Sequence, residues 1–124
     1  MNLKNLKLNA EQVLGADTAI LAEQKPLYEY KEGKKTENQI GMRFDVIAFQ
    51  NGSLASTSVK VEGISPLDVT DEEIIQANKS LNFYFIRFTG FEGKPYNSNN
   101  GMAVSCSAKS VELVSYDEFT LIDV

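Results

Sequence analysis

The chain has 124 residues, with seventeen acidic and twelve basic side chains, no histidine and one cysteine. A hydrophobic share of 43% is typical of a globular protein and excludes a largely disordered chain. No apolar run approaches the roughly 18 residues of a membrane span, and the first nine residues lack the apolar core of a secretory signal. We therefore expect one cytoplasmic domain, residues 1–124, with no membrane partner.

Enzymatic function is the class that the composition argues against most directly. Without histidine there is no usual general base, no imidazole metal ligand and no Ser-His or Cys-His pair. The glycines match neither a phosphate-binding loop nor a dinucleotide fingerprint. The carboxylates within residues 68–73 can be read as metal ligands, but the start of a helix explains them without a metal. We expect a protein that is not an enzyme and binds no cofactor or metal.

The N-terminal residues 1–15 predict a lead-in segment with one short helix that closes one end of a barrel. Asn9 is placed to cap the helix and Gly15 to end it. Residues 18–23 then predict a strand that is broken or bulged near Pro26 and resumes over residues 27–30.

Residues 27–49 predict a long β-hairpin around which the rest of the chain is organised. Its connection, residues 31–39, holds three lysines and a glycine, so we expect a loop that lies in water or against a negative partner. Its second strand, residues 40–49, has the period of two of a half-buried strand. The apolar face of that strand consists of Met42, Phe44, Val46 and Ala48.

A third strand and a helix follow. The Asn51-Gly52 dipeptide is typical of a hairpin turn, and residues 56–62 predict a strand with Val59 and Val61 on its inner side. The pattern then changes to that of a helix over residues 71–79, since Thr70 and Glu73 form a capping box.

Two more strands are predicted, over residues 81–89 and 102–114, the second interrupted near Ala108 and Lys109. Residues 90–101 between them form a long polar loop, and such loops in compact domains are more often functional than idle. Residues 115–124 predict either an acidic tail with an apolar end or an extra strand.

Three strands, one helix and two strands is the element order of the OB-fold. This mainly β fold is a five-stranded Greek-key barrel with its helix between strands 3 and 4. Its second and third strands, with the loops joining strands 1 to 2 and 4 to 5, bind single-stranded nucleic acid. The two polar connections fall at those positions. Other barrels and sandwiches share the strand count, so this order leaves them open.

Charge placement allows a basic face on this acidic chain. Nine acids fall within residues 62–73 and 112–123, and the rest of the chain has eight acidic and twelve basic residues. An evenly mixed surface is the alternative. A single-stranded DNA site needs cations for the phosphates and flat side chains on which bases stack. The candidate cations are Lys31, Lys34, Lys35, Arg43, Lys60 and Lys94, and the stacking candidates are Tyr28, Tyr30, Phe91 and Tyr96.

Each candidate has a structural alternative. Tyr28 and Tyr30 can belong to the core with their hydroxyls at its rim. Phe91 can plug a barrel end, and lysines at a hairpin tip can simply keep the surface soluble. Cys106 lies in a strand pattern and is expected to be a small buried residue.

Three segments resemble small accessory replication proteins of Gram-positive conjugative elements and phages, which are similar to single-strand-binding or helicase-processivity factors. The segments are YEYKEGKKTENQIGMRFDV (residues 28–46), VKVEG with the later Pro66-Leu67, and AKSVELV (residues 108–114). The resemblance implies an OB-like barrel that coats unwound DNA during replication or transfer. A helicase or other replication protein, and further copies of the chain, are its expected partners.

A second function stays open. The acidic segments suit a protein-interaction module or inhibitor, encoded by a mobile element, that docks on a basic host protein.

Overall fold

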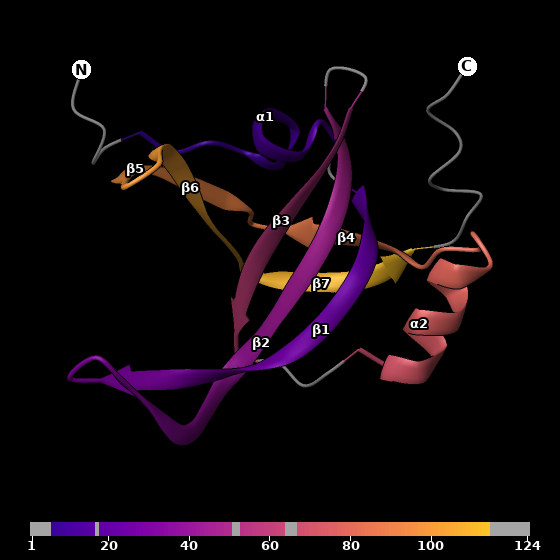
Figure 1. The fold of residues 1–124 in the computed structure, drawn as a ribbon, viewed down its shortest axis with the longest axis horizontal. Helices are drawn as coiled ribbons and strands as arrows, with labels where there is room; N and C mark the ends of the chain where they lie inside the picture. The colour runs from indigo at the N-terminus through magenta and orange to yellow at the C-terminus, as the bar shows by residue number, and fades with distance from the viewer. Residues whose placement is uncertain (1–5, 17, 51–52, 64–66, 115–124) are drawn as a thin grey trace.

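A single curled sheet of seven strands dominates the computed structural model, which describes residues 6–16, 18–50, 53–63 and 67–114 (Figure 1). The elements are α1 (Ala10–Leu14), β1 (Thr18–Lys31), β2 (Lys34–Gln50), β3 (Ser53–Glu62), α2 (Asp71–Lys79), β4 (Phe85–Thr89), β5 (Glu92–Ser98), β6 (Gly101–Ala108) and β7 (Ser110–Val114). The order in the sheet is β5-β6-β3-β2-β1-β4-β7. Its strand pairs are antiparallel, except that β3 and β6 are parallel. The predicted mainly β class is confirmed.

The predicted count of five strands is wrong for two reasons. β5 forms within the predicted loop at residues 90–101, and the predicted strand at residues 102–114 is divided into β6 and β7 at the interruption expected near Ala108 and Lys109. A short break separates β4 from β5, and another separates β6 from β7. The pairing register continues unchanged across the bend, since Thr89 pairs with Ser110 and Glu92 pairs with Ser107. These four strands therefore form one bent hairpin. Its strand β4 pairs with β1, and its strand β6 pairs with β3. The two edge strands of the sheet, β5 and β7, therefore both belong to this hairpin.

Residues 90–101 are mostly strand and not the predicted loop. β5 occupies most of the segment and pairs with β6 along its whole length. No apolar alternation marks it because most of its side chains are exposed and it lies at the edge of the sheet. Pro95, which has no N–H to donate, is compatible with such an edge position.

The predicted loop at residues 31–39 is also wrong, because a two-residue turn joins β1 to β2. Glu32 and Gly33 both have positive φ, at 53° and 78°, as a type I′ turn requires. The last pair between β2 and β3 is Gly41 with Glu62, so residues 28–39 extend beyond β3 as a two-stranded arm. Most side chains of the arm are exposed, which is why its sequence is polar on both faces.

The core forms where the curl brings β2 and β4 to face each other. The predicted inner face of β2 is buried, as are Val59 and Val61 of β3. Phe44 of β2 contacts Phe88 of β4 edge to face, with ring centroids 6.5 Å apart. Ile86 and Phe88 of β4 lie in the core, and Phe85 is buried as well.

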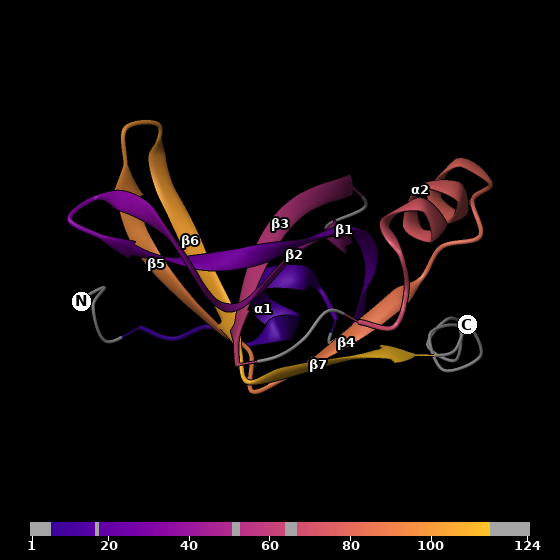
Figure 2. The same cartoon turned by 90° about the horizontal axis from the view of Figure 1, so that it is seen from below.

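Both helices begin and end as predicted. Asn9 caps α1, and Gly15 ends it with a φ of 84°. The capping box of Thr70 and Glu73 starts α2. The apolar side of α1 joins the core near β2 and β5, whereas α2 packs on β1, at the opposite end of the molecule from the arm (Figure 2). Within the described ranges, neither helix has the length and apolar character needed to cross a membrane.

Two predictions fall outside the described residues. They are the turn at residues 51–52 and the tail or extra strand at residues 115–124.

Gly41 marks the place where the arm leaves the sheet, and we expect Gly41→Ala to be destabilising. A Cβ here would collide with the backbone oxygen of Val61 and lie 2.7 Å from the Cα of Glu62. Forcing extra volume into such a site costs about 1–3 kcal/mol of unfolding free energy, measurable by urea denaturation. Gly93→Ala is the comparison, because its Cβ would meet only side-chain atoms. An equal loss of unfolding free energy in Gly41→Ala and Gly93→Ala would contradict the steric role that we assign to Gly41.

Gln24 ties β1 to the segment that precedes α2, and we expect Gln24→Leu to be destabilising. Its buried amide donates from Nε2 to the Val69 oxygen at 2.8 Å and accepts from the Leu67 nitrogen at 3.0 Å. Leucine leaves both backbone groups without that partner, which costs about 1–3 kcal/mol for each group left buried and unsatisfied. Thermal unfolding should show a clear drop for this variant and little change for Gln76→Leu, an exposed position on α2.

Candidate nucleic-acid interface

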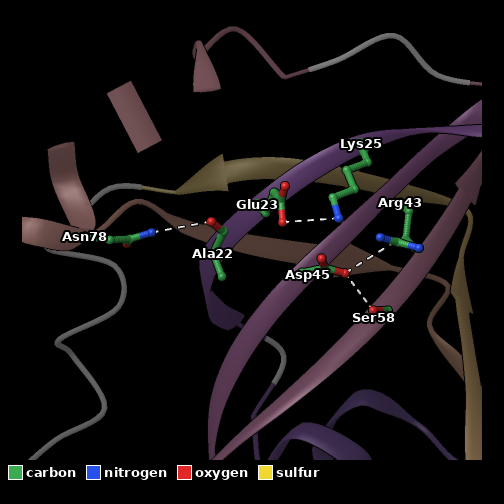
Figure 3. Close-up of polar contacts among 7 residues, drawn as sticks. All are labelled: Ala22, Glu23, Lys25, Arg43, Asp45, Ser58 and Asn78. Carbon is green, nitrogen blue, oxygen red and sulfur yellow. Dashed lines mark hydrogen bonds and ion pairs between the residues drawn. The ribbon is translucent and has the colours of Figure 1, made fainter. Parts of the chain in front are cut away.

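Three cations lie side by side across the outer face of the sheet. Lys25 of β1 pairs with Arg43 of β2, and Arg43 pairs with Lys60 of β3. Directly opposed residues of neighbouring strands project to the same face. The three side chains therefore form a band of positive charge, the cationic ladder, part of which is drawn in Figure 3.

A row of polar side chains beside the ladder neutralises two of its three cations. Glu23 and Asp45 each form an ion pair with the ladder cation two residues away on the same strand, at 3.5 and 3.4 Å. On β3 the corresponding residue is Ser58, whose hydroxyl donates a hydrogen bond to Asp45 at 2.6 Å (Figure 3). Lys60 forms no ion pair among the described residues. It is the ladder cation best placed to bind an external anion.

A hollow of about 860 Å³, the arm hollow, lies where the arm leaves the sheet. Four cations and no carboxylate line it; the lining is Lys25, Pro26, Leu27, Tyr28, Tyr30, Lys35, Arg43 and Lys60. Tyr28 is half-buried, and the Lys35 Nζ lies 4.5 Å from its ring centroid in a cation–π contact. Tyr30 is 64% exposed. The arm hollow thus offers positive charge beside an accessible aromatic ring.

A second hollow of about 650 Å³, the edge hollow, adjoins the first. It shares Tyr28, Tyr30 and Lys60 with the arm hollow and adds Lys109 and one carboxylate, that of Glu62.

The third depression, the cleft, is about 990 Å³ and lies between β3 and the hairpin of β5 and β6. Figure 2 shows this hairpin diverging from β3 on the same side of the molecule as the arm. Lys60, Lys94 and Tyr96 line the cleft, and no carboxylate does. Cys106 lies buried in its lining, and desolvation raises the pKa of the thiol, as expected for an unreactive core cysteine.

Lys60 lines all three depressions and so joins them into one surface, which we call the basic face. The basic face carries six cations, Lys25, Lys35, Arg43, Lys60, Lys94 and Lys109, against one lining carboxylate, although the whole chain has a net charge of −5. The exposed acids at the start of α2 lie at the other end of the molecule (Figure 2). Cations therefore outnumber carboxylates in the lining of the basic face, although Glu23, Asp45 and Glu92 beside it form ion pairs with Lys25, Arg43 and Lys94.

Most of the predicted site residues lie on the basic face. They are Tyr28, Tyr30, Lys35, Arg43, Lys60, Lys94 and Tyr96. Their positions on β1, β2, β3 and β5 come together because the arm and the β5–β6 hairpin project on the same side of β3 (Figures 1 and 2).

The other three predicted residues lie elsewhere. Lys31 and Lys34 pair with each other at the tip of the arm, where Lys31 also approaches Glu29 at 4.0 Å. The arm holds as many glutamates as lysines, so it is not itself basic. Phe91 packs against the core with its ring centroid 5.9 Å from that of Phe88, which favours the structural alternative over stacking on a base.

Two cations of the basic face were not predicted. Lys25 adjoins Pro26, where a break in the strand was expected, and only its pairing with Arg43 places it in the ladder. Lys109 lies at the bend between β6 and β7, where the sequence predicted an interruption of the strand.

Comparisons of the chain with protein-family models, with curated proteins and with solved structures found no match. Within the described ranges there is also no cluster of three or more histidine, cysteine or acidic side chains that could hold a metal ion.

The ladder places like charges directly opposite each other, so we expect Lys60→Gln to stabilise the unliganded protein. Removing one of two opposed cations should raise the unfolding free energy by about 0.2–1 kcal/mol at low salt, with a smaller gain at high salt because ions screen the repulsion. Lys79→Gln is the control and should have the opposite sign, since Lys79 lies in the last turn of α2, where a cation is favourable. An equal change in unfolding free energy for both variants would show that repulsion between the opposed cations does not destabilise the fold.

Proposed function

We propose that this protein is a non-enzymatic single-stranded DNA-binding protein that acts in the replication or transfer of a mobile element or phage. The observation that carries the proposal is the basic face, on which Lys60 links three depressions lined by cations and exposed tyrosines. Proteins that bind single strands without sequence preference combine a positive groove for the backbone with aromatic rings for the bases. The basic face contains both kinds of group.

We also infer that the sheet is an OB-like Greek-key barrel. The β1-β2-β3 meander, the position of α2 between β3 and β4, and the bent hairpin that joins both ends of the sheet support this inference. On this interpretation, β4 with β5 is the fourth barrel strand, and β6 with β7 is the fifth. The ladder then lies on the strands that bind nucleic acid in that fold, and the arm and the β5–β6 hairpin correspond to its two binding loops.

The geometry of the basic face favours a single strand over a duplex. Its cations are distributed over separate depressions with tyrosines between them, and a flexible strand can follow such a surface with its bases turned toward the protein. A helicase partner, assembly into oligomers and a cytoplasmic location remain predictions from the sequence.

Lys60→Gln tests the proposal most directly. We expect it to weaken the binding of oligothymidylate in fluorescence anisotropy and to make the salt dependence shallower by about 0.7 in the slope of log K against log salt, the value for one phosphate contact on a single strand. Lys79→Gln, on α2 and away from the basic face, should bind like the unchanged protein.

A wild-type protein that binds no oligonucleotide, even at low salt, would contradict the proposal. In that case the exposed acids at the start of α2 would become the surface to test, with a basic host protein as the partner.

A further inference from the structure

Tyr30 stands between two hollows that are each large enough for one nucleotide. The arm hollow and the edge hollow share Tyr28, Tyr30 and Lys60 in their linings. Tyr28 is half-buried beneath Lys35, whereas Tyr30 is 64% exposed. Among the residues that line both hollows, Tyr30 is therefore the exposed aromatic one.

Hydrogen bonds across the arm hold the strand that carries these tyrosines. Opposite Glu29, β2 contains extra residues that form a bulge. The Thr36 hydroxyl donates to the Glu29 backbone oxygen at 2.7 Å, and the Asn38 side-chain amide donates to the Glu29 carboxylate at 2.6 Å. The first bond holds the Glu29 backbone and the second holds its side chain, so both act on the residue that precedes Tyr30.

The charges of the two hollows suit two sugar-phosphate units in succession. Each has a volume within the range of about 300–1,000 Å³ that is usual for small-molecule sites. Lys60 lines both, so it lies where a phosphate shared by the two nucleotides would pass. The arm hollow contains three further cations, and the edge hollow contains Lys109 together with the carboxylate of Glu62.

We propose that Tyr30 is a wedge that enters between two consecutive bases of a bound single strand, with one base in the arm hollow and the next in the edge hollow. The proposal rests on the function proposed above and adds how the strand is held. Insertion of Tyr30 replaces the stacking of one base on the next by stacking of each base on the tyrosine ring. A paired duplex resists such separation of its bases, so the wedge also selects for single strands.

The test uses an oligonucleotide of about eight nucleotides built only of 2-aminopurine, whose fluorescence is quenched when neighbouring bases stack. Whichever two neighbouring bases reach Tyr30, both are then 2-aminopurines that stack on each other in the free oligonucleotide. We expect saturating wild-type protein to raise the fluorescence. Tyr30→Ala should lose the rise and weaken binding by about tenfold, while Tyr30→Phe, which keeps the ring, should retain both. Because Tyr30 is mostly exposed, these variants should fold normally, which circular dichroism verifies.

The outcomes separate this inference from the function on which it rests. Lys60→Gln should weaken binding yet keep the fluorescence rise at saturation, because it removes a charge and leaves the ring in place. Tight binding by the wild type without a rise, or an equal rise with Tyr30→Ala, overturns the wedge and leaves DNA binding standing. Failure of the wild type to bind overturns both.

Discussion

The alignment of three cations across β1, β2 and β3 is the constraint on which the candidate interface depends. Like charges on directly opposed strand positions repel each other, and the fold offsets this only in part. Glu23 and Asp45 pair with two of the cations, while Ser58 stands where a third acid would neutralise Lys60. A surface that leaves Lys60 without an ion pair among the described residues is better suited to an external anion than to the stability of the free protein.

The strand register explains why this alignment exists and why the arm follows it. Gly41 pairs with Glu62 at the last position shared by β2 and β3, and Arg43 pairs with Lys60 two residues earlier along β3. The same register that opposes the cations thus ends the three-stranded part of the sheet just beyond them. The tyrosines of the arm then lie close to the ladder, and charge and aromatic surface meet at one place.

The sequence predicted the parts of the fold that local chemistry determines. The caps at Asn9, Gly15 and Thr70 and the buried face of β2 were correct, because each depends on neighbours within a few residues. The arm and β5 were predicted as loops, since strands that are exposed on both faces carry no apolar alternation. Lys25 was missed because its place in the ladder depends on its pairing with Arg43 of β2, which the sequence pattern of β1 alone does not reveal.

The parallel contact between β3 and β6 extends over only three residue pairs, whereas β1 and β2 pair along most of their length. The outer half of the bent hairpin is therefore attached to β3 over a short length, although Cys106 joins the core. Its exposed far end is the kind of segment that opens locally at lower free energy than the core. The exposed far end of the β5–β6 hairpin can thus accumulate substitutions while the remainder of the protein keeps its thermodynamic stability.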